Sequence, residues 1–203
     1  MSALKSPCLQ PAALACLALL SACGAPPGTE LFPLEAGHQW TYAQHTEWET
    51  GATDDELLTL RNLGPDRSLP DGSAWRRHSD SGADYWLRAD ATGIYRVASQ
   101  SELDGEPHPD TAPRYVLKHP IAPGTSWQAS TTAYLLQRRQ EFPRELRHAH
   151  PDIPMNYVIE ATGQTVRTRA GEFAGCVKVV GQAKLRLFAD PVGGWRDLPL
   201  TTT

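Results

Sequence analysis

The chain has 203 residues, of which 40% are hydrophobic and 21% charged, and its formal net charge is -4 at pH 7. The hydrophobic content excludes a wholly disordered chain, and the mild acidity gives no general attraction to nucleic acid. Seventeen prolines and 16 glycines interrupt the chain too often for a bundle of long helices, so the composition favours many short elements joined by turns.

The first 22 residues have the features of a secretory signal peptide. Lys5 supplies a positive start, and an apolar run of nine residues from Ala12 to Leu20 follows. A transmembrane helix needs about 20 apolar residues, so this run is too short to span a bilayer. Its length and position are typical of the apolar region of a cleaved signal peptide.

The segment Leu20-Ser21-Ala22-Cys23 resembles the lipobox of bacterial lipoproteins. The resemblance implies that the Cys23 thiol receives a diacylglyceryl group and that cleavage makes Cys23 the new N-terminus. Several acyl chains anchor a protein stably, because each buried methylene contributes about 0.8 kcal/mol. The alternative is an ordinary signal peptide cut nearby, with no special role for Cys23. By the same resemblance, Gly24 points to the outer membrane, with the protein facing the periplasm.

We expect residues 23–31 to be the lipidated cysteine and a short tether, and residues 32–203 to be a single, mainly β domain. From His38 to Glu49, large aromatic residues alternate with polar ones, which is the period of a half-buried strand. Leu57–Arg61 is expected to be the neighbouring strand, after an acidic turn at Thr53–Asp55. The whole pattern favours a curved antiparallel sheet, or a partly open barrel or sandwich, with little helix.

Residues 83–97 contain the clearest hairpin signal. Apolar and polar residues alternate up to Asp90, a turn follows, and the segment Ile94–Val97 is again rich in strand-forming residues. Gly93 is expected to take a positive φ at this turn. Trp86 interrupts the alternation on the polar side.

The second half of the chain predicts further strands. Residues 156–162 alternate, Gly163 is expected to turn the chain into residues 165–169, and another turn is expected at residues 170–173. Residues 176–180 are mostly apolar, as in a central strand, and residues 183–187 alternate after it. Residues 138–150 are rich in charge and contain Pro143. They are predicted to be a solvated loop rather than a short helix.

A short internal repeat links two parts of the chain. Pro33, Gly37 and Trp40 recur as Pro120, Gly124 and Trp127 at identical spacing, with an aliphatic residue after each proline. In each copy the glycine is expected to turn the chain and the tryptophan to anchor a new strand in the core. Two related halves of one sheet and independent use of the same turn explain the repeat equally well.

Two longer segments resemble a group of uncharacterised bacterial envelope lipoproteins. These are Phe32-Pro33-Leu34 through Gly37 to Trp40-Thr41-Tyr42, and Ala170-Gly171-Glu172-Phe173 through Cys176 to Val179. The resemblance implies a mainly β exported domain without assigned chemistry. Proteins of this group often continue into a final strand pair rich in Trp-Tyr and Gly-Val-Gly, so we expect either that the closing strand is missing here or that the sequence is a shortened form.

No catalytic or cofactor motif is present in the sequence, and we expect no cofactor, metal or catalytic residue. If Cys23 is lipidated, Cys176 is the only other cysteine of the mature chain, and its valine neighbours favour a structural role in the core. His148 and His150 share a spacing that suits two ligands on one strand face, but further ligands are not evident. The cluster Asp54–Glu56 is best explained as a solvated turn.

The six tryptophans are the most informative side chains. Most are expected to be core anchors, above all Trp40 and Trp127. If Trp48 and Trp86 are instead exposed, an aromatic cleft for a glycan or lipid becomes plausible.

The sequence therefore favours a non-enzymatic, membrane-anchored lipoprotein of the bacterial envelope, with an envelope protein, a lipid or a glycan as its partner. The alternatives are an accessory subunit of a larger assembly and an envelope hydrolase that uses carboxylates in an aromatic cleft. A deep apolar cavity would favour lipid binding, clustered buried carboxylates would favour the hydrolase, and a flat apolar patch would favour the accessory subunit.

Overall fold

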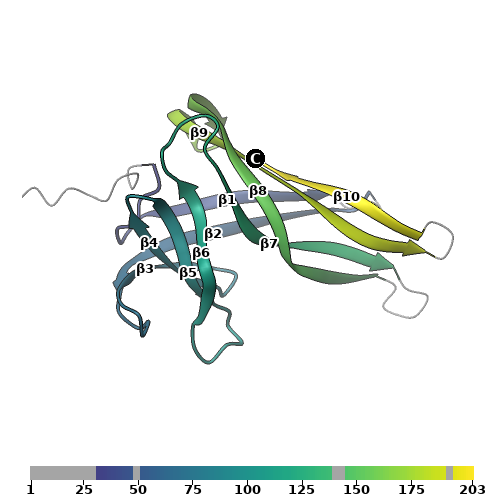
Figure 1. Ribbon diagram of the computed structural model, residues 1–203, viewed down its shortest axis with the longest axis horizontal. Helices are drawn as coiled ribbons and strands as arrows, with labels where there is room; N and C mark the ends of the chain where they lie inside the picture. Colours follow the sequence, from purple (N-terminus) through teal and green to yellow (C-terminus); the bar gives the residue numbers. More distant parts are fainter. Residues whose placement is uncertain (1–30, 48–50, 139–144, 191–193) are drawn as a thin grey trace, which may run out of the picture.

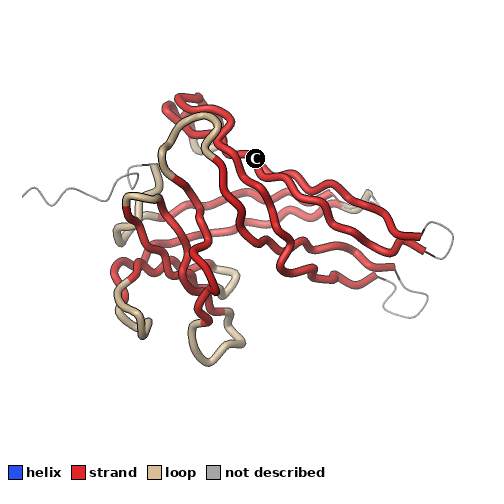
Figure 2. The backbone as a smooth tube through the Cα atoms, viewed as in Figure 1, coloured by secondary structure: helices blue, strands red, loops and turns tan. Residues whose placement is uncertain are grey.

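A computed structural model describes residues 31–47, 51–138, 145–190 and 194–203. These residues form ten antiparallel β-strands and no helix (Figures 1 and 2). Each strand pairs with those next to it in sequence, except that β6 and β7 belong to different sheets. The prediction of a mainly β fold built on a curved antiparallel sheet is confirmed.

The first six strands form sheet A, which curls into a half-barrel (Figure 1). Its strands are β1 (Gln39–Glu47), β2 (Thr53–Asp66), β3 (Ala74–Ser79), β4 (Asp84–Asp90), β5 (Gly93–Gln100) and β6 (His108–Lys118). The predicted hairpin is β4–β5. Gly93 opens β5 with a φ of 142°. A Cβ there would lie 2.2 Å from the carbonyl oxygen of Leu117, so only glycine fits.

The last four strands form sheet B and project well beyond β3–β6 (Figure 1). They are β7 (Ser126–Arg138), β8 (Glu145–Thr168), β9 (Gly171–Asp190) and β10 (Gly194–Thr202). The predicted alternation over residues 183–187 is confirmed, because Ala183, Leu185 and Leu187 are half-buried whereas Gln182, Lys184 and Arg186 are exposed.

Two apolar clusters form the core. The larger joins sheet A to the base of sheet B and consists of Leu34, Leu87, Ile94, Leu117, Trp127, Ala129 and Ile159. The smaller consists of Leu69, Ala74, Trp86 and Ala98. Trp86 and Leu87 are consecutive and both buried, because successive strand residues point to opposite faces. The polar face that carries Trp86 is thus covered at this point, in part by Arg76, whose guanidinium lies 5.4 Å from the ring centroid.

Three segments that were predicted to be turns or loops belong to strands in the described part of the structure. Thr53–Asp55 is not a turn but the start of β2, paired with Glu47, Thr46 and His45 of β1. The charged side chains suggested a turn, yet on an exposed hairpin they face water and tolerate strand geometry. His45 Nδ1 lies 2.7 Å from an Asp55 carboxylate oxygen across this pair.

Gly163 does not turn the chain either. β8 runs on to Thr168, and the register shifts near Gly163 absorb its φ of 67° as a local irregularity. The turn comes at residues 169–170. The predicted solvated loop at 138–150 is also wrong for the described part. Arg138 ends β7 and residues 145–150 begin β8, while residues 139–144 lie outside the described residues.

The repeated segments open the first strand of each sheet. In the first copy, Gly37 has a φ of 92°. Its N–H donates to the carbonyl oxygen of Asn62 at 3.1 Å, and the Asn62 N–H donates to the carbonyl oxygen of His38 at 2.9 Å. The turn is thereby fixed to β2, the second strand of sheet A.

The second copy repeats this pattern in sheet B. Gly124 has a φ of 93°. Its N–H donates to the carbonyl oxygen of Ile159 at 2.9 Å, and the Ile159 N–H donates to the carbonyl oxygen of Thr125 at 2.8 Å. The sequence repeat is therefore also a structural one, and we refer to the two copies as the opening turns.

Candidate binding faces

Sheet B has one apolar and one polar face. Residues paired across neighbouring strands share a face, and the pairs Ala129 with Met155 and Leu185 with Leu198 lie on the apolar side. The polar side carries the pairs Gln128 with Asn156 and Arg186 with Asp197. Such an amphipathic sheet is expected to cover its apolar side with another part of the molecule or with a partner.

The described residues of the apolar side are buried on β7 and β8 and pack on the core at Val177 and Val179 of β9, but they are less covered further along β9 and on β10. Ile153 and Met155 on β8 are each 5% exposed. Five residues further across the sheet are only half-buried and pack against neither core cluster: Ala183, Leu185, Leu187, Leu198 and Leu200. We call these five residues the open face.

The strand β10 also has a free edge. Within the described residues it pairs only with β9, so the backbone groups on its outer edge have no partner strand. Such an edge is a template for strand addition. Pro199 removes one N–H from β10, which limits but does not abolish this capacity.

An exposed aromatic pair lies at the far end of the same hairpin. Phe188 and Trp195 are 55% and 63% exposed, and their ring centroids are 5.7 Å apart in a T-shaped arrangement. The guanidinium of Arg186 lies 5.8 Å from the Trp195 ring. Trp195 is thus not a core anchor. Exposed aromatic groups beside an arginine are typical of interaction surfaces.

The site residues expected from the sequence lie apart from the open face. Trp127 is 7% exposed, donates its indole N–H to the Tyr115 carbonyl oxygen at 3.1 Å and stacks on Tyr157. Trp40 is only half-buried, and Cys176 is partly exposed on β9 rather than fully in the core. Cys23 and Trp48 lie outside the described residues.

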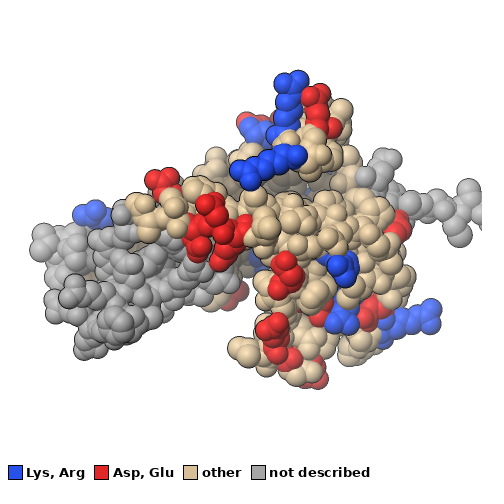
Figure 3. Space-filling view, turned by 180° about the vertical axis from the view of Figure 1, so that it is seen from behind, with Lys and Arg blue, Asp and Glu red and all other residues tan. Residues whose placement is uncertain are grey.

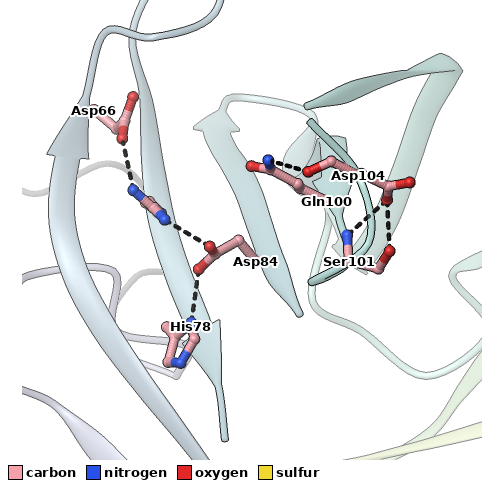
Figure 4. Close-up of polar contacts among 7 residues, drawn as sticks. Asp66, His78, Asp84, Gln100, Ser101 and Asp104 are labelled. Carbon is pink, nitrogen blue, oxygen red and sulfur yellow. Dashed lines mark hydrogen bonds and ion pairs between the residues drawn. The ribbon is translucent and has the colours of Figure 1, made fainter. Parts of the chain in front are cut away.

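Carboxylates do cluster on sheet A, around Asp84 (Figure 4). Arg76 donates to one Asp84 oxygen at 2.6 Å, His78 Nδ1 lies 2.9 Å from the other, and Asp66 lies 3.9 Å from Arg76. Burial alone would raise the pKa of Asp84, but the contacts with Arg76 and His78 bring that pKa below its usual value. A carboxylate held in its ionised form is a poor general acid, so this cluster has the properties of a structural ion-pair network.

A second group in Figure 4 closes the loop after β5. The backbone N–H and hydroxyl of Ser101 donate to one Asp104 carboxylate oxygen at 2.7 and 2.8 Å, and the Gln100 amide donates to the Asp104 carbonyl oxygen at 3.0 Å. All of these contacts serve the turn itself. The cluster Asp54–Glu56 lies on β2, where adjacent side chains point to opposite faces.

A hollow at the β1–β2 hairpin has a lining of mixed polarity. It has a volume of about 420 Å³ between β1, β2 and Arg169, and its lining includes His45, Asp55 and Glu56. None of the described residues forms a group of three or more side chains suited to hold a metal ion. The described part of the chain also contains no helix that is long and apolar enough to cross a membrane.

Charge is dispersed over the face drawn in Figure 3. Basic side chains there do not merge into one continuous area, and acidic ones lie among them. Comparison with known proteins gives no further guide: no family model, no curated protein and no solved structure matches this chain.

Proposed function

We propose that the protein is a membrane-anchored lipoprotein of the bacterial envelope and a non-enzymatic accessory module that binds a partner protein through the open face. The sequence Leu20-Ser21-Ala22-Cys23 after a short apolar run supports the lipid anchor. The observation that carries the binding role is the apolar side of sheet B, which is buried at Ile153 and Met155 on β8 but only half-buried at the five residues of the open face.

The shape of this surface favours a protein over a lipid. A lipid carrier encloses its ligand in a deep apolar cavity, whereas the open face lies on two paired strands, beside a free strand edge. A protein strand satisfies both features, because its backbone pairs with the edge and its alternate side chains pack on the leucines.

The hydrolase alternative receives less support. An aromatic cleft was expected only if Trp48 and Trp86 were exposed, and Trp86 is 1% exposed. The partly buried carboxylate of Asp84 is engaged by Arg76 and His78. A binding module needs neither a free acid nor an aromatic cleft.

Anchoring is tested by Cys23→Ala. The wild-type protein should incorporate labelled fatty acid and remain in the membrane fraction after a high-salt wash. The variant should lose the label and leave that fraction. Retention of the variant in washed membranes would contradict the lipid anchor.

Partner binding is tested by photo-crosslinking in cells. A photoreactive residue at Leu185 or Leu198, on the open face, should give a discrete adduct with one protein. The same residue at Lys184, on the polar side of β9, is the matched control and should give none. Equal adducts from both sides, or none from the open face, would contradict the proposal.

A further inference from the structure

A small pocket lies in sheet A, where residues 31–33 pass over β1. It has a volume of about 120 Å³ and is lined by Leu31, Phe32, Pro33, Trp40, Tyr42 and Arg77. Leu31 is 45% exposed. The pocket shares no residue with the open face of sheet B.

The charged group of this pocket is Arg77, which is 7% exposed. Its guanidinium lies 4.2 Å from the Phe32 ring centroid and 4.8 Å from that of Trp40. Its Nε donates to the Asn62 side-chain oxygen at 2.8 Å, and its Nη2 donates to the Pro33 carbonyl oxygen at 3.1 Å. All of these partners are uncharged, so they fix the side chain without neutralising it.

Three other arginines of sheet A have an acidic partner. Arg76 pairs with Asp84, Arg88 with Asp71 and Arg96 with Asp110. Arg77, although more buried, forms no ion pair with any described carboxylate. Burial lowers the pKa of Arg77 to about 10, so the group stays cationic at neutral pH. A buried cation without a counter-ion is unfavourable, and an anionic ligand would remove that penalty.

The hydrogen-bonding geometry leaves one edge of Arg77 available. A guanidinium has five N–H groups, and two of them are engaged by Asn62 and Pro33. The remaining edge, formed by Nη1 and the second Nη2 hydrogen, has no partner among the described residues. Such an edge matches the two oxygens of a carboxylate or phosphate in a bidentate contact.

We propose that this pocket binds one small anionic group, a carboxylate or a phosphate, against Arg77 between the aromatic walls of Phe32 and Trp40. The pocket volume of about 120 Å³ is enough for one such group. The site goes beyond the proposed partner-binding role, because it uses different residues and a different chemistry.

The test uses the purified full mature protein and two probes, inorganic phosphate and acetate. Tryptophan fluorescence and the melting temperature are followed during each titration. We expect saturable binding of at least one probe, with a rise in melting temperature, because a ligand that binds only the folded state stabilises it.

The decisive variant is Leu31→Glu, which puts a competing carboxylate at the pocket and leaves Arg77 in place. It should weaken binding at least tenfold. Leu103→Glu makes the same charge change at a residue that is 96% exposed and does not line the pocket, and it should bind like the wild type. Equal weakening in both variants would identify an adventitious surface effect and overturn the proposal.

Vesicles distinguish the source of the anion. Leu31-dependent binding to phosphatidylglycerol vesicles, but not to phosphatidylcholine vesicles, would support the proposal with a lipid headgroup as ligand. Leu31-dependent binding of the free anions alone would support it with a soluble ligand. No saturable binding in any arm would overturn it, while leaving the crosslinking test of the open face unaffected.

Discussion

The two opening turns have the same backbone pattern but lead into sheets with different interiors. In each, the glycine N–H is bound by a deeply buried residue of the following strand, Asn62 in sheet A and Ile159 in sheet B. Asn62 binds Arg77 and the Pro33 carbonyl oxygen, whereas Ile159 belongs to the apolar core. The same pattern of backbone hydrogen bonds therefore occurs beside a polar interior in sheet A and beside an apolar interior in sheet B.

The two sheets also differ in how completely their faces are buried. Sheet A curls, and β4 carries a buried side chain on each of its faces, Trp86 on one and Leu87 on the other. Among the described side chains of sheet B, the fully buried ones lie at its base, and β9 and β10 project with an apolar side that is half-exposed. Sheet A therefore has the properties of a support, and sheet B those of a binding surface.

The largest expected difference between the turns concerns their tryptophans. Trp127→Ala should cost about 3–5 kcal/mol of unfolding free energy, because it opens a cavity in the main core. Trp40→Ala should cost at least about 1 kcal/mol less, because Trp40 is half-buried and loses mainly contacts with Arg77. Denaturant unfolding of both variants beside the wild type measures the difference. Equal losses of unfolding free energy in the two variants would contradict the claim that Trp127 is a core residue and Trp40 is not.

The two buried strand residues give the next comparison. Ile159→Ala should cost about 2–5 kcal/mol through lost packing. Asn62→Ala should cost about 1–3 kcal/mol, because it leaves the buried Arg77 Nε without its acceptor. Asn62→Asp provides the sharper control, since it restores an acceptor and adds a counter-charge for Arg77. In thermal unfolding, the melting temperature of Asn62→Asp should be higher than that of Asn62→Ala. The reverse order would contradict the claim that polar contacts with Arg77 stabilise this turn.

The glycines should respond alike. Gly37 and Gly124 have φ values of 92° and 93°, and a Cβ at either would meet nothing within 4 Å. Alanine at each position should therefore cost about 1–2 kcal/mol from backbone strain alone. Gly105, which carries no positive φ and has open space around it, is a matched control and should tolerate alanine. Costs that differ by more than about 1 kcal/mol between Gly37 and Gly124 would argue against structural equivalence.

The smallest expected effect is a pH dependence centred on sheet A. The folded-state pKa of Asp84 lies below 3.8, so its stabilising contribution is complete above the unfolded-state pKa and is lost as pH falls through the folded-state value. Asp84→Asn should consequently lower stability at pH 7 and flatten the loss of stability between pH 5 and 3. Melting curves across this range test the prediction, and parallel pH profiles for variant and wild type would refute it.

Much of the fold could be predicted from local patterns. The alternation around Trp40, the β4–β5 turn at Gly93 and the repeat at Gly37 and Gly124 are local signals, and each corresponds to a strand or turn in the structure. Turns at Thr53–Asp55 and Gly163 were mispredicted, because charge and glycine also occur inside exposed or irregular strands.

The candidate site depended on information that a sequence does not carry locally. The alternation of Ala183, Leu185 and Leu187 indicates a half-buried strand, but it does not show whether another element covers that side. The contrast between Asn62 and Ile159 was equally hidden, because each meets its opening turn only through strand pairing.

The central claim, that the open face of sheet B is covered by a partner in the cell, is tested most directly by hydrogen–deuterium exchange. The exchange of the purified protein is compared with that of the same protein in isolated native membranes. The account predicts that amides of β10 exchange quickly in the purified protein and more slowly in membranes, while amides of β3–β5 are unchanged. Unchanged exchange in β10, or new protection confined to sheet A, would contradict it.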